Sequence, residues 1–123
     1  MALRRDIRLR RRSDFDAVFR GGRLFNDPLL VLRTLPNNLD HNRYGFVTSK
    51  RLGGAVVRNR VRRRLQEIVR LSRAGQDTAP DLGGRDIVLS AKAAAAVASY
   101  QELAASVRRL FAKGGLLAEE AGS

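Results

Sequence analysis

The sequence predicts a single α+β domain, in which helices cover one β-sheet. Three observations favour this class. The chain has 123 residues, which suits one compact domain and is too few for two of ordinary size. Hydrophobic residues make up 44% of it, which is sufficient for a modest core. Segments typical of helices and strands follow one another in the order αβββαβα, with no internal repeat or domain boundary.

Residues 1–12 predict a basic N-terminal arm. They contain six arginines against one acid, Asp6, and little apolar content. Repulsion between the charges favours an extended segment. A solvated tail would explain the same composition, and a mitochondrial transit peptide is a weaker alternative because such peptides are also rich in serine.

Residues 13–20 predict a short helix. Ser13 is a typical N-cap, and Asp14 and Asp16 fall in the first turn, where the helix dipole favours acids. The alternative role for these two carboxylates is to hold a cation. Gly21 and Gly22 would end the helix. Its apolar residues recur at helical spacing: Phe15, Val18 and Phe19.

The next segments predict three strands. Residues 23–26 form a small edge strand, and the apolar run 29–35 and the run 44–49 have β-type composition. Residues 37–42 are rich in Asn and Asp, which is typical of a turn. We therefore expect the runs 29–35 and 44–49 to pair as a hairpin.

A long amphipathic helix is predicted over residues 55–73. The segment from Lys50 to Arg73 has nine cations and one acid, Glu67. A solvated helix normally mixes signs to gain pairs four residues apart, so we interpret the basic face as a surface for a polyanion. The opposite stripe is narrow and mostly apolar: Val57, Val61, Leu65, Ile68 and Ser72.

The remaining chain predicts a loop over 74–84, a strand over 86–90 and a closing helix. The alanine-rich segment 93–98 is either helical or a linker. Ser99 and Glu102 fit a capping box at the start of the closing helix. The domain is thus expected to span residues 13–113, with a flexible C-terminal tail at 114–123.

The composition excludes several kinds of catalytic site. Without cysteine there is no disulfide, thiolate zinc site or cysteine nucleophile. His41 is the single histidine and lies in a polar turn, so we interpret it as an exposed turn residue. Glycine motifs of nucleotide-binding enzymes are also absent. We infer that the chain supplies no catalytic acid, base or nucleophile.

The formal net charge of +12 indicates a polyanionic partner, which could be RNA, DNA or an anionic membrane surface. No apolar run approaches the ~18 residues of a membrane span. The basic start is not followed by a signal-peptide region. We therefore expect a cytoplasmic protein.

Residues 49–64 combine a strand end, a glycine turn and a helix start with a dense basic cluster. The turn lets backbone N–H groups approach an anion, and a helix N-terminus favours phosphate. Asn59 could both donate and accept hydrogen bonds against a base edge or a 2′-hydroxyl. An arginine guanidinium can hold phosphate with two hydrogen bonds. The cations of this cluster are Lys50, Arg51, Arg58, Arg60, Arg62, Arg63 and Arg64.

Phe15 and Phe19 lie one turn apart and admit two interpretations. Both could belong to the core. The alternative is a partly exposed aromatic surface on which unpaired bases stack, while Val18 does the packing.

The segment 49–63, SKRLGGAVVRNRVRR, resembles the signature of the bacterial ribonuclease P protein subunit, with the Arg-Asn-Arg core at residues 58–60. The likeness extends from about Arg8 to about Lys113. It includes these further matches: Arg8-Leu9-Arg10-Arg11, Asp14-Phe15, Val18-Phe19, Gly45-Phe46 and Leu110-Phe111.

The resemblance implies a mixed four-stranded sheet, like that of the second domain of ribosomal protein S5. It also implies a rare left-handed βαβ crossover from residues 44–49 to 86–90. In that family the protein assists a ribonucleoprotein endonuclease that removes the 5′ leader from precursor tRNA. The RNA subunit carries the active site and mainly holds the Mg²⁺, and no protein partner is implied.

Site residues follow from the resemblance by position. The residues expected to face the catalytic RNA are Ser49, Lys50, Arg51, Arg58, Asn59, Arg60, Arg62 and Arg63. Phe15, Phe19 and Arg33 are expected to contact the leader in a cleft between the first helix and the sheet. Arg33 replaces a frequent aromatic residue, which favours an ionic contact, and Gln66 replaces an Arg of the motif, which leaves that RNA contact open.

Two other functions need the same charge. One is structural binding of ribosomal RNA, which composition alone does not exclude. The other is DNA binding through the basic helix in a major groove. The density of arginine suits phosphate better than base readout.

Overall fold

The computed structural model describes residues 7–74 and 84–116. The predicted element order αβββαβα is confirmed. The elements are α1 (Arg12–Gly21), β1 (Arg23–Asn26), β2 (Leu30–Pro36), β3 (Arg43–Val47), α2 (Ala55–Ala74), β4 (Arg85–Ala91) and α3 (Tyr100–Lys113), with 3₁₀ turns η2 (Lys50–Leu52) and η4 (Ala93–Ala96).

The four strands form one mixed sheet in the order β1-β2-β4-β3. Strand β2 pairs antiparallel with β1 and β4, whereas β3 pairs parallel with β4. The expected hairpin between residues 29–35 and 44–49 is therefore wrong, because β4 lies between these two segments. Ile87, Val88 and Leu89 are consecutive and all buried, and a strand that is apolar on both faces belongs at the centre of a sheet.

Helix α2 connects β3 to its parallel neighbour β4, which confirms the expected βαβ crossover. The left hand of this crossover stays a prediction. The connection after α2 includes residues 75–83, so most of the predicted loop 74–84 lies outside the described residues.

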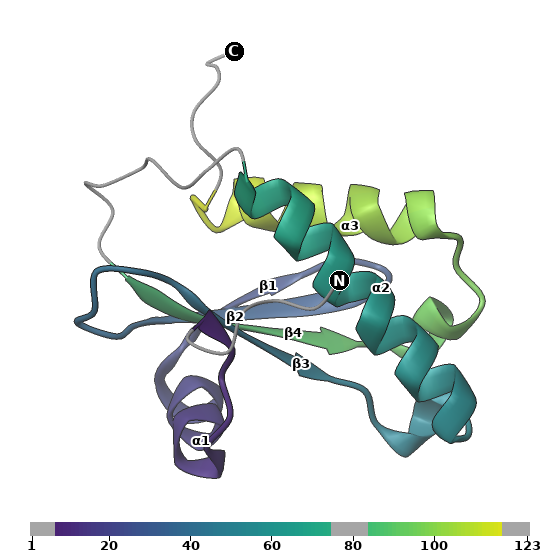
Figure 1. Cartoon of the computed structure of the whole chain (residues 1–123), viewed down its shortest axis with the longest axis horizontal. Helices are drawn as coiled ribbons and strands as arrows, with labels where there is room; N and C mark the ends of the chain where they lie inside the picture. Colours follow the sequence, from purple (N-terminus) through teal and green to yellow (C-terminus); the bar gives the residue numbers. More distant parts are fainter. Residues whose placement is uncertain (1–6, 75–83, 117–123) are drawn as a thin grey trace.

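The helices cover the two faces of the sheet unequally (Figure 1). Helices α2 and α3 pack on one face over the main core, which includes Leu32, Leu89, Leu65 and Val107. The shorter helix α1 lies on the other face, where Val18 packs with Leu9 and Val88 in a smaller cluster. The face of the sheet that carries α1 is thus less covered by helices than the other face.

The N-terminal arm is packed where the structure describes it. Ile7 is 2% exposed and Leu9 is 6% exposed. The Leu9 N–H donates to the Tyr44 carbonyl over 2.8 Å, and Arg8 forms a parallel bridge with Tyr44. Residues 7–9 therefore lie against the edge strand β3. The first six residues of the predicted arm lie outside the described residues, as do residues 117–123 of the predicted tail.

The prediction of Ser13 as the N-cap of α1 is wrong. The helix begins at Arg12, and its N-cap is Arg11, which makes no side-chain cap hydrogen bond. The N–H groups of Asp14 and Phe15 both donate to the Arg11 carbonyl, which sets the start of the helix before Ser13. In contrast, the capping box of α3 is confirmed: Ser99 Oγ accepts from the Glu102 N–H, and Glu102 Oε1 accepts from the Ser99 N–H.

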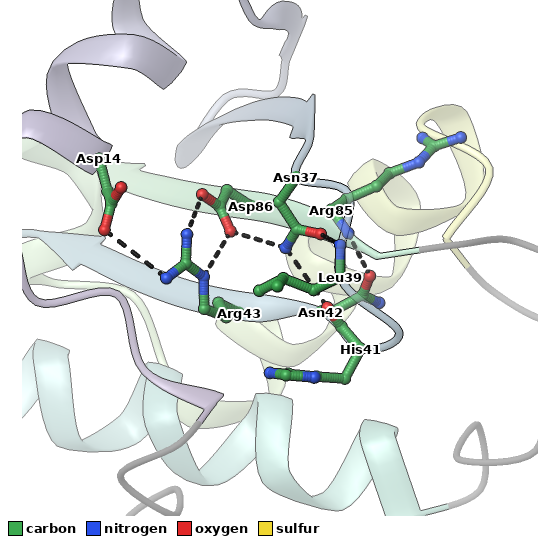
Figure 2. Close-up of polar contacts among 8 residues, drawn as sticks. All are labelled: Asp14, Asn37, Leu39, His41, Asn42, Arg43, Arg85 and Asp86. Atoms are coloured by element: carbon green, nitrogen blue, oxygen red, sulfur yellow. Dashed lines mark hydrogen bonds and ion pairs between the residues drawn. The ribbon is translucent and has the colours of Figure 1, made fainter.

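A polar cluster fastens β3 and β4 to the turn at 37–42 (Figure 2). The buried Asp86 carboxylate accepts two hydrogen bonds from Arg43, over 2.8 and 2.7 Å, and one from Asn37 over 2.8 Å. Arg43 also lies 3.6 Å from Asp14 of α1. The bond to Asp86 raises the pKa of Arg43 above its ordinary value. Asp86 thereby joins two strands, a turn and a helix.

A second buried carboxylate fastens α3 to the chain between β1 and β2. Asp27 accepts a hydrogen bond from Ser106 Oγ over 2.5 Å and two from the Arg109 guanidinium over 2.8 and 3.1 Å. The bond to Arg109 is the main cause that lowers the pKa of Asp27 to about 2, against the opposing effect of burial.

We expect Asp27→Asn to lower the free energy of unfolding by about 2 kcal/mol at pH 7, because a folded-state pKa below the unfolded value stabilises the charged form. This stabilisation is present above the unfolded pKa and is lost as pH falls through the folded pKa. Urea unfolding between pH 7 and pH 2 should therefore show the wild-type and variant curves converging below about pH 4. The exposed Asp16→Asn is the matched control, and a constant gap at all pH values would contradict the prediction.

Candidate nucleic-acid interface

The basic cluster lies at a strand end, a turn and the start of α2, as predicted, and the 3₁₀ turn η2 comes before the expected glycines. Ser49 Oγ accepts from the Arg51 N–H over 3.4 Å and caps η2. Gly53 follows with φ of 137°, a conformation that side chains other than glycine's strongly disfavour. Helix α2 then begins at Ala55. This turn sets the direction of α2 relative to β3.

The residues expected to face the catalytic RNA are accessible to different degrees. Exposed members are Ser49, Lys50, Arg51, Asn59 and Arg63. Partly exposed members are Arg58, Arg60 and Arg62. None of the described residues places a carboxylate within 4 Å of these arginine side chains. No described carboxylate therefore neutralises the positive charge of the cluster.

Arg62 is held by neutral acceptors at the end of β3. Its guanidinium donates to Asn59 Oδ1 over 2.8 Å and to Thr48 Oγ1 over 2.5 Å. Both acceptors are uncharged, so they fix the position of the cation and leave its charge available to an anion. Such a fixed guanidinium loses less side-chain entropy when it binds phosphate.

Arg60 lies on a different side of α2 from Arg58 and Arg62. Its Nη2 donates to the Ala96 carbonyl over 3.0 Å, and Arg64 Nη1 donates to the Ala98 carbonyl over 3.3 Å. These two arginines hold the connection between β4 and α3. Because residues 60 and 64 are one turn apart, helical spacing could have separated them from Arg58 and Arg62. This contact was not predicted, and Arg60 is among the residues expected to face the RNA.

The single acid of α2 is paired within the helix. Arg70 donates to Glu67 over 3.1 and 2.7 Å, and this hydrogen bonding is the main cause that lowers the pKa of Glu67 to about 2. Glu67 therefore carries its charge at neutral pH next to Arg70, and it leaves the charge at the start of α2 undiminished.

The two phenylalanines of α1 differ in their burial. Phe15 is half-buried, and its ring lies so close to Gly45 that a Cβ there would be 2.6 Å from ring atoms. Glycine at position 45 thus permits Phe15 to pack onto β3. Phe19 is 43% exposed. Val18 between them is fully buried and does the packing of the helix.

Arg33 of β2 stacks on Phe19. The guanidinium carbon lies 4.6 Å from the centroid of the ring, a cation–π contact. The three residues expected at the leader therefore divide into a packed ring, Phe15, and a surface pair, Phe19 and Arg33. The surface pair lies where α1 meets the open face of the sheet.

Arg8 and Arg10 also lie at this surface, although they are not among the residues expected at it from the sequence. They lie with Arg62 and Gln66 around a cavity of about 240 Å³ beside β3. The signal was available, because Ile7 and Leu9 alternate with these arginines in the period of a strand. The excess of charge in residues 1–12 favours an extended basic arm, an interpretation that takes no account of this alternation.

The described residues contain no group of three or more His, Asp or Glu that could hold a metal ion. His41 lies in the predicted turn, with Nδ1 2.9 Å from Asp40 Oδ1. None of the helices in the described part of the chain is long and apolar enough to cross a membrane.

Comparison with known families decides which kind of basic interface this is. A sequence profile of the ribonuclease P family, described as Ribonuclease P, matches residues 3–115. The chain belongs to the ribonuclease P protein family. Two ribonuclease P protein components illustrate the similarity. That of Dehalococcoides mccartyi strain CBDB1 is 38% identical over 91% of the chain and 88% of the relative. That of Roseiflexus castenholzii is 40% identical over 94% and 91%.

Solved structures of ribonuclease P proteins share the fold. The Staphylococcus aureus protein has a TM-score of 0.79 and 23% identity, over 90% of this chain and 97% of that one. The Thermotoga maritima protein has a TM-score of 0.75 and 24% identity, over 86% and 96%. The α+β class with a mixed four-stranded sheet is thus confirmed. Family membership implies a tRNA-processing subunit of an endoribonuclease complex with an RNA partner.

Proposed function

We propose that this ribonuclease P protein binds the catalytic RNA and the 5′ leader of precursor tRNA. In this role it assists the magnesium-dependent endonucleolytic removal of the leader, which gives the mature tRNA 5′ end. The observation that carries the proposal is the basic side of α2, which no described carboxylate neutralises, with Arg62 fixed by two uncharged acceptors. The protein is the non-catalytic subunit of this hydrolase, and the active site lies on the RNA.

The RNA-facing surface in this proposal comprises the exposed and partly exposed cluster around η2 and the start of α2. Its members are Ser49, Lys50, Arg51, Arg58, Asn59, Arg62 and Arg63. Arg60 contributes through the N–H groups that it does not use on Ala96, and it also positions η4. Arginine forks and serine hydroxyls in this arrangement suit the phosphates of a folded RNA better than the deep, narrow major groove of its helices.

The leader is proposed to pass over Phe19 and Arg33 toward Phe15. The Arg33 guanidinium occupies one face of the Phe19 ring. Because Phe19 is 43% exposed, the residue still offers surface to an unpaired base. Arg33 would then act in two ways, as a cation for a leader phosphate and as a support for the ring. This explains how the position can serve without the aromatic side chain frequent in relatives.

Magnesium is proposed to be held mainly by the RNA subunit. The described part of the protein offers no set of three carboxylates or imidazoles for a metal ion, so its donor groups do not fit a resident magnesium. We propose no step of the reaction through a protein-bound ion. The cations of the interface would act instead by reducing the phosphate repulsion that magnesium otherwise screens.

Cleavage of a 5′-labelled precursor tRNA tests the proposal. We expect the protein alone to cleave nothing, because no described group supplies the chemistry. With the cognate RNA at limiting magnesium, it should restore cleavage that the RNA alone performs only at higher magnesium. Unchanged magnesium dependence of leader removal, with the protein shown to be folded, would refute the proposed function.

Replacing Phe19 by alanine is expected to weaken binding of precursor tRNA by about tenfold, the loss of one stacked base. Binding of mature tRNA to the same holoenzyme should change little, because mature tRNA has no leader. Phe15→Ala should impair precursor binding as well, with some loss of stability. Leu71→Ala, an exposed apolar side chain on α2, is the control. Equal losses for both tRNAs would mean that the rings are structural.

A further inference from the structure

A cavity of about 240 Å³ lies between the described end of the arm, α1, the edge strand β3 and α2. Its wall combines three kinds of side chain. Arg8, Arg10 and Arg62 are cations, Phe15 and Phe46 are aromatic rings, and Gln66 carries a carboxamide. None of the described residues that line it carries a carboxylate. A cavity of this kind is large enough for one small planar ligand with an anionic group.

Two of these arginines are suited to bind an anion. The Nε atom of Arg8 is buried and has no hydrogen-bond partner among the described residues. Arg62 is held by Thr48 and Asn59, both uncharged. A buried N–H without an acceptor is unfavourable, and a phosphate oxygen in the cavity would supply the missing acceptor.

Gln66 offers an uncharged hydrogen-bonding partner for a nucleic-acid base. Its carboxamide can both donate and accept, and it makes no hydrogen bond with another described residue. The half-buried rings of Phe15 and Phe46 provide apolar surface near it. Phe15 reaches this position because Gly45 has no Cβ.

The edge of β3 adds backbone groups to the cavity. The Tyr44 carbonyl accepts from the Leu9 N–H, so it points away from β4. Residues two apart in a strand point their backbone groups to the same side. Phe46 therefore directs its N–H and C=O to the edge of the sheet, beyond the single described bridge between Arg8 and Tyr44.

We propose that this cavity binds one unpaired nucleotide of the RNA partner. Its phosphate lies on Arg8 and Arg62, and its base lies against the rings with an edge paired to Gln66. The inference rests on the proposed function, because it takes RNA as the partner. It adds to that function a single-nucleotide site that links the basic cluster of α2 to the N-terminal arm.

The test uses adenosine 5′-monophosphate and the full chain, followed by NMR chemical shifts of the backbone amides. We expect saturable shifts at Gly45 and Phe46, with inorganic phosphate and adenosine each binding more weakly than the nucleotide. Gln66→Ala should weaken nucleotide binding about fivefold, the loss of one or two hydrogen bonds, and leave phosphate binding unchanged. Gln101→Ala, an exposed glutamine on α3, is the matched control.

Two results would overturn the site. Equal affinity for phosphate and nucleotide, unaffected by Gln66→Ala, would mean an anion site only. Shifts confined to residues around Phe19 and Arg33 would place the nucleotide elsewhere. Neither result depends on the RNA subunit. A nucleotide that binds here in a protein that fails to change the magnesium dependence of cleavage would refute the proposed function and retain the site.

Discussion

The affinity of the protein for its cognate RNA is expected to fall by several hundredfold between 50 and 200 mM monovalent salt. If about six cations displace counterions from phosphates, the plot of log affinity against log salt has a slope of roughly −4 to −5. The estimate suits this structure because the cations around η2 and the start of α2 have no described carboxylate partner. The measurement is a filter-binding titration at several salt concentrations.

Single variants show how much each arginine contributes to this slope. Arg58→Ala and Arg62→Ala should each flatten it by about one unit. Arg64→Ala is the matched control on the same helix, because its guanidinium binds the Ala98 carbonyl; it should lower stability more than it changes the slope. An unchanged slope for both Arg58→Ala and Arg62→Ala would place the RNA on another surface.

Replacing Asp86 by alanine is expected to lower the free energy of unfolding by about 3 kcal/mol, in the range for breaking a buried ion pair. The variant removes the acceptor of two Arg43 hydrogen bonds and one Asn37 hydrogen bond together. It leaves a partly buried guanidinium without its main partner, so the loss exceeds that of an ordinary surface pair. Chemical denaturation followed by circular dichroism measures it.

The double variant Asp86→Ala/Arg43→Ala isolates the pair from its surroundings. Its loss of stability should be less than the sum of the single losses, because each single variant strands the other group. Asp40→Ala is the control, since Asp40 is exposed and its ion-pair partner among the described residues is the turn residue His41. A loss below about 1 kcal/mol for Asp86→Ala, as for a surface pair, would show that the cluster in Figure 2 is not a main support of the sheet.

Local signals in the sequence predicted the elements because the forces that form them are local. Glycines end α1 and precede α2, the box of Ser99 and Glu102 begins α3, and a stripe at helical spacing identifies α2. Ser13 shows the limit of such rules. It is a favourable capping residue, but the chain on its N-terminal side is packed against β3, and this packing starts the helix at Arg12.

Strand neighbours could not be predicted in the same way. The composition of the turn between β2 and β3 favours pairing these two strands as a hairpin. Strand β4 is nevertheless the better neighbour for both, because it is apolar on two faces. The same limit applies to the interface. Charge and spacing located the basic cluster, but only tertiary structure places Arg60 on η4 and brings Arg8 beside Arg62. The exposure of Phe19 and the burial of Val18 likewise depend on which face of α1 meets the sheet.

The sheet order has a consequence for biosynthesis. Strand β4, which lies between β2 and β3, is the last of the four to leave the ribosome, so β3 has no partner strand in the sheet until residues 85–91 have been made. A nascent chain that already displays its arginine-rich helix therefore still lacks the support that orients it. Contacts between segments so distant along the chain slow folding, and we expect fragments that stop before β4 to attract RNA by charge alone, without a defined shape.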